Sequence, residues 1–340
     1  MTHLLMQLAI DKAWRYQGLT YPNPAVGAVV TYRDKIVAVE AHQRAGTSHA
    51  EVLALLSAYE QISGQMIDFD RFDAHKSHMF LSNLPNEFFK EASIFVTLEP
   101  CNHSGKTPSC AILLEKLQLK KVTIALRDPI DGHSGGIERL ISAGITGDGG
   151  LLEERARELI EPFLIWQSRA FVLFKLAQTT NGKIGGGYLS SQESLTHVHK
   201  LRAVCDELLI GGNTVRVDRP TLDCRFVDEK APNVTIYSKN GDFDRDISLF
   251  GVPDREVVVT DDLAILDRPS FVLVEGGEGM MRAMQDRIDW SLIYQTPKLS
   301  SNSLSYDVDV ELTFLHVDKR SRDIMLWSKV SKIGDFTKES

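Results

Sequence analysis

The chain of 340 residues predicts an α/β fold in two domains. Short apolar runs rich in β-branched residues alternate with amphipathic stretches of helical period along most of it, which is typical of mainly parallel sheets. The length suggests more than one domain. A composition of 43% hydrophobic and 25% charged residues is that of an ordinary globular protein. We therefore expect a mainly parallel sheet in each half.

The first half shows the clearest periods. Leu4, Leu5, Leu8 and Trp14 predict a helix over residues 3–17 that ends at Gly18. Two apolar strands follow, and the Arg33-Asp34 pair between them predicts a hairpin. The expected elements of this half are strands at 25–32, 35–42, 93–98 and 121–126, and helices at 49–63, 108–119 and 137–143.

Residues 64–91 differ from the rest of the first half. They mix polar residues with scattered aromatic ones and show no sustained period. We interpret them as an insertion on the surface, partly helical near residues 86–90.

A helix over 151–169 is expected to join the two domains, which we place at residues 1–148 and 149–340. The second domain repeats the alternation of strand and helix. Its expected strands are 171–178, 207–211, 234–237, 256–260 and 270–275, and its expected helices are 191–203 and 279–287.

Charge and cysteine content narrow the classes of function. A net charge of −8 and a pI near 5.7 give no electrostatic footprint for nucleic acid. The first residues lack the features of a secretory signal, and no apolar run approaches the ~18 residues of a membrane span. The four cysteines are therefore expected to be reduced thiols. These observations predict a cytoplasmic enzyme without nucleic-acid or membrane partners.

One histidine and two cysteines predict a zinc site. His49, Cys101 and Cys110 supply three ligands, which leaves a fourth position for water and is typical of a catalytic zinc. Glu51, two residues after the histidine, is placed to move protons. A His-x-Glu followed by Pro-Cys and a second Cys is the pattern of zinc nucleobase deaminases. The expected helix starts near His49 and Cys110 would stabilise thiolates.

The alternatives are a structural zinc site and core cysteines without a metal. The His-Ala-Glu triplet alone is weak evidence, but with the TLEPC sequence at 97–101 and the second cysteine the signature is specific. His42 and His103 are not assigned to the metal, because a fourth protein ligand would close the site.

These residues resemble the bifunctional deaminase-reductase family of riboflavin biosynthesis, RibD. The first-domain motifs that carry the resemblance are PNPAVG at 22–27, HQRAG at 42–46, HAE at 49–51 and TLEPCNHSGKTPSC at 97–110. The resemblance implies a cytidine-deaminase-like α/β/α sandwich. It also implies hydrolytic deamination of 2,5-diamino-6-(5-phosphoribosylamino)pyrimidin-4(3H)-one.

The resemblance also implies substrate contacts in the first domain at Asn23, His42, Lys106 and Asp128. A lysine ammonium suits a phosphate. Asn23 could equally be a turn residue, and Lys106 a solvated surface lysine. The family's Asp-Pro-Asn-Pro is Asp-Pro-Ile-Asp at 128–131 here, which removes a contact at residue 130 and leaves Asp128.

The second domain resembles the family's reductase, whose fold is like that of dihydrofolate reductase. The matching motifs are KLA at 175–177, NGK at 181–183, LRA at 201–203, GGNTV at 211–215, DRPTL at 218–222 and VEGG at 274–277. The resemblance implies NADPH reduction of the ribosyl group to ribityl, giving 5-amino-6-(5-phosphoribitylamino)uracil. It implies NADPH contacts at Ala177, Thr214, Asp218 and Gly277, and substrate contacts at Arg202, Leu222, Arg225 and Glu275.

A Gly-Gly turn before a helix lets the backbone approach a phosphate, although a tight turn explains it equally well. This half departs further from the family. Residues 185–191 are a shorter stretch in which Tyr188 replaces a tryptophan, Arg219 replaces an aspartate, and 296–301 read TPKLSS.

The sequence supports three hypotheses. The first is a zinc deaminase followed by an NADPH reductase, in a chain expected to form a homo-oligomer, with a dimer favoured. The second is a deaminase with a degenerate C-terminal domain that serves binding or dimerisation, acting on this pyrimidine, on nucleosides or on tRNA. The third is a non-catalytic zinc-stabilised interaction module.

Overall fold

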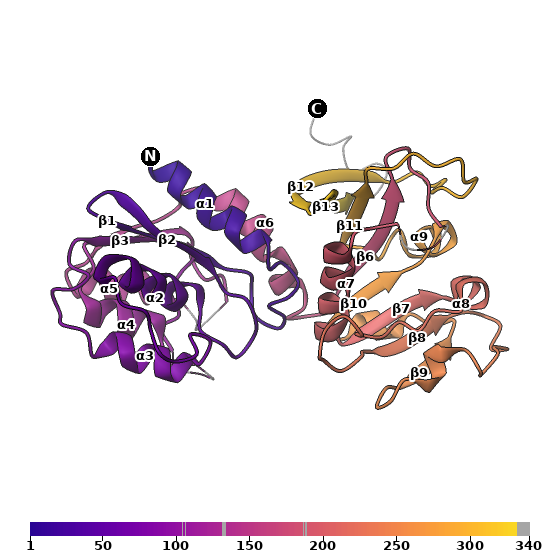
Figure 1. The fold of residues 1–340 in the computed structure, drawn as a ribbon, viewed down its shortest axis with the longest axis horizontal. Helices are drawn as coiled ribbons and strands as arrows, with labels where there is room; N and C mark the ends of the chain where they lie inside the picture. Colours follow the sequence, from indigo (N-terminus) through magenta and orange to yellow (C-terminus); the bar gives the residue numbers. More distant parts are fainter. Residues whose placement is uncertain (104, 106, 131–133, 186, 188, 332–340) are drawn as a thin grey trace. The chain divides into compact units, whose positions relative to one another are not determined.

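The computed structural model describes residues 1–103, 105, 107–130, 134–185, 187 and 189–331. The chain divides into two compact units, Met1–Phe163 and Leu164–Ser340 (Figure 1). The functional boundary that we expect after residue 148 stays a prediction. In the described part of the chain, no helix is long and apolar enough to cross a bilayer.

The described residues of the first unit form a five-stranded sheet in the order β2-β1-β3-β4-β5. The predicted hairpin joins β1 to β2, and its turn residues Arg33 and Asp34 both have positive φ, 49° and 63°, as a type I′ turn requires. β1 also pairs antiparallel with β3, while β3, β4 and β5 are parallel. The expectation of a mainly parallel sheet is therefore wrong for this unit. The strands are β1 Gly27–Tyr32, β2 Lys35–Ala41, β3 Ala92–Leu98, β4 Lys121–Leu126 and β5 Thr146–Asp148.

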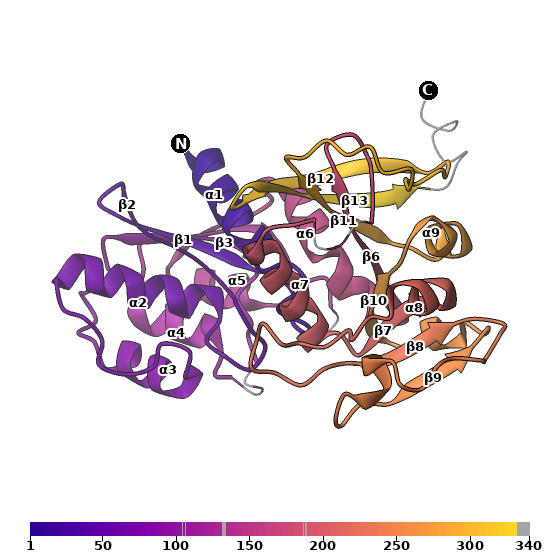
Figure 2. The ribbon, with the colours of Figure 1, turned by 45° about the vertical axis from the view of Figure 1, so that its right-hand side comes forward.

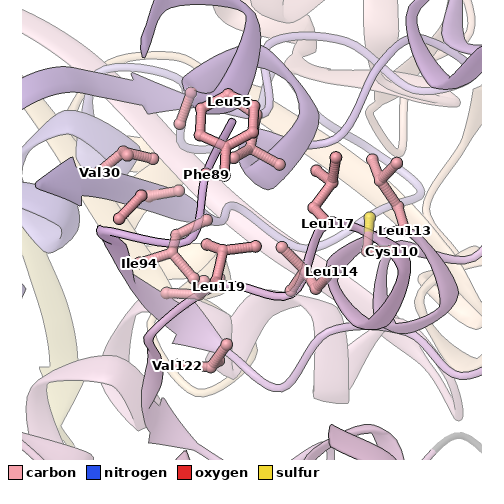
Figure 3. Packing of buried hydrophobic residues seen from close by; sticks show 14 of the residues in the cluster. Val30, Leu55, Phe89, Ile94, Cys110, Leu113, Leu114, Leu117, Leu119 and Val122 are labelled. Carbon is pink, nitrogen blue, oxygen red and sulfur yellow. The ribbon is translucent and has the colours of Figure 1, made fainter. Parts of the chain in front are cut away.

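Helices cover both faces of this sheet. They are α1 Thr2–Trp14, α2 Ala50–Ser63, α3 Ala74–Ser82, α4 Cys110–Leu117, α5 Gly136–Ser142 and α6 Glu153–Ile165. Figure 3 shows the core between the sheet and α2 and α4, where Leu55, Ile94 and Leu114 are fully buried. The other face packs closely on α1, because a Cβ on Gly27 would lie 1.9 Å from the Ala9 carbonyl oxygen. The result is an α/β/α sandwich.

The segment 64–91 is more ordered than its sequence suggests. The prediction of a helix near residues 86–90 is wrong: the helix is α3, and 86–90 form turns. Leu81 and Phe89 of this segment are fully buried in the core, and the ring of Phe80 lies 4.9 Å from that of Tyr59 on α2. Its aromatic residues enter the core from turns as well as from the helix, so they show no single period.

The described residues of the second unit form an eight-stranded sheet in the order β12-β13-β11-β6-β10-β7-β8-β9 (Figure 2). The pairs from β11 to β9 are parallel, as predicted. The antiparallel strands β12 and β13 continue the sheet beyond β11. The strands are β6 Ala170–Thr179, β7 Glu207–Gly211, β8 Asn233–Tyr237, β9 Val257–Thr260, β10 Ser270–Glu275, β11 Trp290–Thr296, β12 Glu311–Arg320 and β13 Asp323–Ser331.

The helices of this unit are α7 Gln192–Val204, α8 Gly212–Asp218 and α9 Glu278–Met284, with short 3-10 turns at Ser248–Gly251 and Ala264–Asp267. In the parallel part of the sheet, β10 lies between β6 and β7, although it follows both in the chain. Ligands of open α/β sheets bind beyond the carboxyl ends of the strands where the strand order switches. A second site is therefore expected at the carboxyl ends of β6, β10 and β7.

Candidate metal centre and reductase site

The three predicted zinc ligands lie together in the first unit. The Nδ1 atom of His49 is 3.8 Å from the Cys101 sulfur and 3.4 Å from the Cys110 sulfur. Tetrahedral zinc with bonds of about 2.3 Å to sulfur and 2.0–2.1 Å to nitrogen would place these atoms about 3.5 Å apart. The donor set and its spacing therefore fit a zinc ion bound through His49 Nδ1 and the two sulfurs.

Local structure fixes each ligand. His49 is the N-cap residue of α2. The Ser109 side chain caps α4 through the Ile112 N–H, and its hydroxyl donates to the Cys101 carbonyl at 2.7 Å, which brings Cys101 beside Cys110. Thr107 Oγ1 is 3.1 Å from His49 Nε2. Because Nδ1 faces the sulfurs, Nε2 carries the proton and donates a hydrogen bond to the Thr107 hydroxyl. Metal-bound histidines commonly donate their second ring N–H to an outer partner in this way.

Contact between the two thiols shifts their pKa values in opposite directions. The hydrogen bond from Cys110, supported by one with His49, holds the pKa of Cys101 at about 4 despite its burial. The same contact and burial raise the pKa of Cys110 well above its ordinary value. The hydrogen bonds from Cys110 and His49 thus favour the thiolate of Cys101 at neutral pH. A thiolate is the form that binds metal.

Glu51 and His42 stand beside the ligands. Glu51, in the first turn of α2, is 4% exposed, and its burial raises the pKa of its carboxyl group although the His49 charge opposes this. A raised pKa brings a carboxyl group nearer to the range useful for proton transfer at neutral pH. Burial is the largest cause that lowers the pKa of His42 to about 4, and the charge of His49 adds to it. This imidazole is therefore neutral at pH 7.

A cavity of about 360 Å³ joins these groups. Its wall includes the predicted residues Asn23, His42, His49, Glu51, Cys101 and Asp128. Cys110 is fully buried in the core cluster. Lys106 lies outside the described residues. The remaining predicted residues of this half thus lie on or directly beside one cavity.

Sequence reasoning did not find several residues of this site. Thr107 lies inside the quoted 97–110 motif, but only its contact with His49 reveals a role. His78 on α3 lies outside the cavity wall but near the ligands: its burial lowers its pKa to about 4, and the Cys101 charge opposes this. It comes from the segment that we interpreted as a surface insertion. No sequence signal could have linked it to a ligand 29 positions earlier.

Glu99 was also missed as a structural anchor. One carboxylate oxygen accepts hydrogen bonds from the backbone N–H groups of Gly135 and Ile137, each at 3.0 Å. The other accepts from the Asp128 N–H at 3.1 Å. This buried carboxylate therefore holds both the loop that carries Asp128 and the start of α5.

We expect Glu99→Gln to destabilise the first unit by about 1–3 kcal/mol. The amide keeps the shape but turns an NH₂ group toward a backbone donor, and a buried N–H that loses its acceptor costs about this much. Urea unfolding of the full chain measures the change, and Glu91→Gln, an exposed residue of the same unit, is the control. Equal stability of the two variants would refute the anchoring role.

In the second unit, three charged side chains meet: Lys175 in the middle of β6, Glu275 at the end of β10 and Arg202 in the last turn of α7. Glu275 accepts a bidentate hydrogen bond from Arg202 at 2.7 and 2.9 Å, and Lys175 Nζ lies 2.9 Å away. Burial opposes the ionised carboxylate, but Arg202 and Lys175 outweigh it and hold the pKa of Glu275 well below its usual range. Glu275 is therefore ionised at neutral pH.

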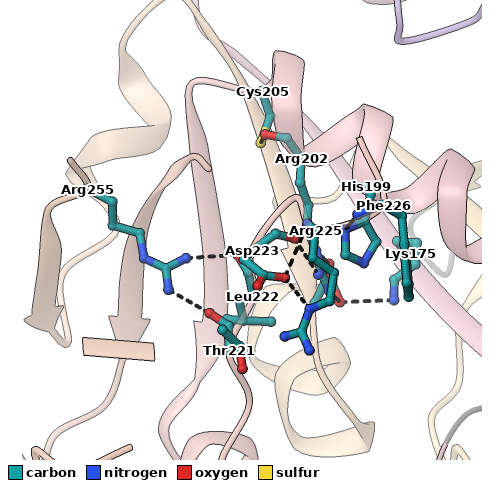
Figure 4. Close-up of polar contacts among 11 residues, drawn as sticks. Lys175, His199, Arg202, Cys205, Thr221, Leu222, Asp223, Arg225, Phe226 and Arg255 are labelled. Atoms are coloured by element: carbon teal, nitrogen blue, oxygen red, sulfur yellow. Dashed lines mark hydrogen bonds and ion pairs between the residues drawn. The ribbon is translucent and has the colours of Figure 1, made fainter. Parts of the chain in front are cut away.

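The loop after α8 continues this cluster. Arg202 also donates to the Asp223 carbonyl at 3.2 Å, and Arg225 pairs with the Asp223 carboxylate at 2.8 Å (Figure 4). Leu222 directly precedes Asp223 in the chain, and its carbonyl accepts a hydrogen bond from Arg255. The structure thus joins three of the four predicted substrate residues, Arg202, Arg225 and Glu275, by direct contacts or through Asp223.

The predicted NADPH residues lie at the carboxyl ends of the same strands. Ala177 is near the end of β6, Thr214 and Asp218 are on α8 directly after β7, and Gly277 caps α9 directly after β10. Packing explains the glycine at position 276, because a Cβ there would lie 2.6 Å from the Met280 Cβ. The prediction for Tyr188 falls outside the described residues.

Comparison with known proteins gives two family matches. Residues 1–126 match the cytidine and deoxycytidylate deaminase zinc-binding region, and residues 170–302 match the RibD C-terminal domain. The α/β fold class with these two domain types is therefore confirmed.

Curated relatives cover both units. The riboflavin biosynthesis protein RibD of Bacillus amyloliquefaciens is 32% identical over 85% of this chain and 69% of its own length. That of Corynebacterium ammoniagenes is 30% identical over 88% and 87%. That of Aquifex aeolicus is 39% identical over 67% of this chain, and the match spans 59% of the relative, less than two thirds.

A solved structure is similar over almost the whole chain. It is a diaminohydroxyphosphoribosylaminopyrimidine deaminase/5-amino-6-(5-phosphoribosylamino)uracil reductase from Thermotoga maritima, with a TM-score of 0.64 at 26% identity. The match covers 97% of this chain and 99% of that one.

Proposed function

The chain belongs to the RibD family of riboflavin biosynthesis proteins, and from this premise we propose that it catalyses two consecutive steps. The first is zinc-dependent hydrolytic deamination of 2,5-diamino-6-(5-phosphoribosylamino)pyrimidin-4(3H)-one. The second is NADPH reduction of the ribosyl group, which gives 5-amino-6-(5-phosphoribitylamino)uracil. The observation that carries the proposal is the cluster of His49, Cys101 and Cys110, of which His49 and Cys101 line the same cavity as Glu51.

In the first step, zinc supplies an activated water at neutral pH when it is bound. Glu51 would take one proton of the attacking water and deliver it to the ring nitrogen, and would then carry the second proton of that water to the departing amino group. The balance is one water consumed and one ammonia released, with a carbonyl in place of the amine. Burial of Glu51 favours this role because it brings the carboxyl group's pKa closer to neutrality.

Residues of the cavity wall hold the substrate in this proposal. Asn23, the neutral imidazole of His42 and Asp128 face the polar edges of the pyrimidine, and Lys106 binds its phosphate. The hydrogen bond of 3.2 Å between Asn23 Nδ2 and His42 Nε2 supports a joint role for these two side chains.

In the second step, NADPH supplies the hydride when it is bound, and the protein orients cofactor and substrate. We place Ala177, Thr214, Asp218 and Gly277 against the cofactor, and Arg202, Leu222, Arg225 and Glu275 against the substrate. Arg202 is already engaged by Glu275, so its part is to order that carboxylate. Arg225, whose side chain is 47% exposed, is the better placed of the two arginines to meet a phosphate.

The match of residues 170–302 to the RibD C-terminal domain argues against a degenerate second domain. A homodimer remains part of the proposal. The cytoplasmic location expected from the sequence stays a prediction.

We expect metal removal to separate the two activities. A chelator that strips zinc from the full chain should abolish ammonia release, because the activated water is lost, and added zinc should restore it. NADPH oxidation with the deaminated intermediate should continue at its original rate.

Two measurements on one preparation test this, namely ammonia release and absorbance of NADPH. Ammonia release that persists in zinc-free protein would refute the metal mechanism. Failure to oxidise NADPH by protein that still releases ammonia would refute the second step.

A further inference from the structure

The segment that leads into α3 contacts the residue directly before the candidate ligand His49. Ser48 is fully buried, and its hydroxyl donates to the Arg71 carbonyl at 2.7 Å. The Ser77 hydroxyl lies 3.2 Å from that of Ser48 and 3.0 Å from the same carbonyl. The Ser48 N–H donates to the Phe72 carbonyl at 3.2 Å. One short stretch thus binds Ser48 through both its backbone and its side chain.

Ser48 in turn orients His42. Its carbonyl oxygen lies 3.2 Å from His42 Nδ1, and because a carbonyl can only accept, Nδ1 must carry the proton. The Nε2 atom of the neutral ring is then an acceptor, and the Asn23 amide donates to it at 3.2 Å. The position of Ser48 therefore decides how both a metal ligand and a residue of the cavity wall are presented.

The segment is itself fixed to the helix that begins after His49. The Arg71 guanidinium pairs with Glu60 at 2.7 Å and donates to Ser57 at 3.2 Å, and both partners are on α2. α3 packs against α2, whose N-cap residue is His49, and against α4, which begins at Cys110. Because this stretch is bonded both to Ser48 and to α2, it can fix the position of Ser48 as well as fill space.

We propose that residues 71–77, here called the support segment, are a positioning element of the metal centre that acts through Ser48. The proposal rests on the deaminase function proposed above. It assigns a role to part of the segment 64–91, which the sequence presented as a surface insertion. The support segment holds the backbone of His49 where Nδ1 meets the two sulfurs, and it holds the carbonyl that sets the His42 tautomer.

The test is Ser48→Ala in the full chain, followed by two metal readouts that need no substrate. Zinc affinity is measured by competition with a chromogenic chelator. The geometry of the ligands is measured by the visible absorption of the cobalt(II)-substituted protein. We expect zinc affinity to fall roughly 10-fold, the lower end of what outer partners of metal ligands contribute. We also expect the cobalt bands to shift.

Ser77 provides a second variant and an internal check. Ser77→Ala should weaken zinc binding less than Ser48→Ala. Because Ser77 acts through Ser48, the double variant should lose no more than Ser48→Ala alone. The matched control is Ser82→Ala, the same substitution on the same helix, which should leave zinc affinity and the cobalt spectrum unchanged. Thermal unfolding of each variant verifies that all are folded.

Two results would overturn the proposal. One is a Ser48→Ala protein with the zinc affinity and cobalt spectrum of the parent. The other is an equal loss in Ser82→Ala, which would show a general loosening of α3. The deaminase function fails separately, if the parent chain binds zinc but releases no ammonia from the pyrimidine. The metal readouts decide the role of the support segment in that case too.

Discussion

Replacing Glu51 by Gln should lower the rate of ammonia release by a factor of roughly 10² to 10⁴, the usual contribution of general acid–base catalysis. The amide has nearly the same shape as the carboxyl group but cannot take a proton from water and pass it on. The three candidate ligands are untouched, so we expect the variant to keep one zinc per chain. Ammonia release and metal content, measured on the same preparation, check the two halves of this expectation.

The matched control for Glu51→Gln is Glu91→Gln, an exposed glutamate of the same unit, which should keep the parent rate. NADPH oxidation with the deaminated intermediate should be normal in both variants. A Glu51→Gln protein that binds zinc and still deaminates at the parent rate would show that the proton carrier is another group.

The chemistry of the metal centre could be predicted because its residues lie in short motifs. His49 and Glu51 are two positions apart, and Cys101 and Cys110 are nine positions apart, with Cys110 at the start of α4. The hairpin at Arg33-Asp34 was predictable for the same reason. In each case, the residues that specify the feature are neighbours in the chain.

The supports of the site could not be predicted, because they join distant parts of the chain. Glu99 holds backbone groups at 128, 135 and 137, and Ser48 is held from 71, 72 and 77. Most of these partners are backbone atoms, which leave no mark in a sequence. The strand β12 was missed for another reason: its alternation of apolar and polar residues changes phase at Leu315, where the pairing register with β13 shifts between Phe314 and His316.

The second site depends on charge balance more than the first does. Lys175 and Arg202 are 15% and 12% exposed, and Glu275 is the carboxylate that faces both. Two mostly buried cations close to one another repel unless an anion lies between them. The lowered pKa of Glu275 means that this anion stabilises the fold at every pH above its ordinary value near 4.5. That stabilisation is lost as the pH falls toward the lowered value.

Glu275→Gln should therefore destabilise the second unit by about 3–5 kcal/mol, the cost of removing one partner from a buried ion pair, and should abolish NADPH oxidation. Calorimetry of the full chain measures the first effect. Glu278→Gln, three residues from Glu275, removes an exposed i,i+4 ion pair with Arg282 and should cost at most about 1 kcal/mol. Adding Lys175→Met to Glu275→Gln removes one of the two unpaired cations, so it should recover part of the stability. It should not restore NADPH oxidation. A Glu275→Gln protein as stable as the Glu278→Gln control would mean that water, and not this carboxylate, neutralises the two cations.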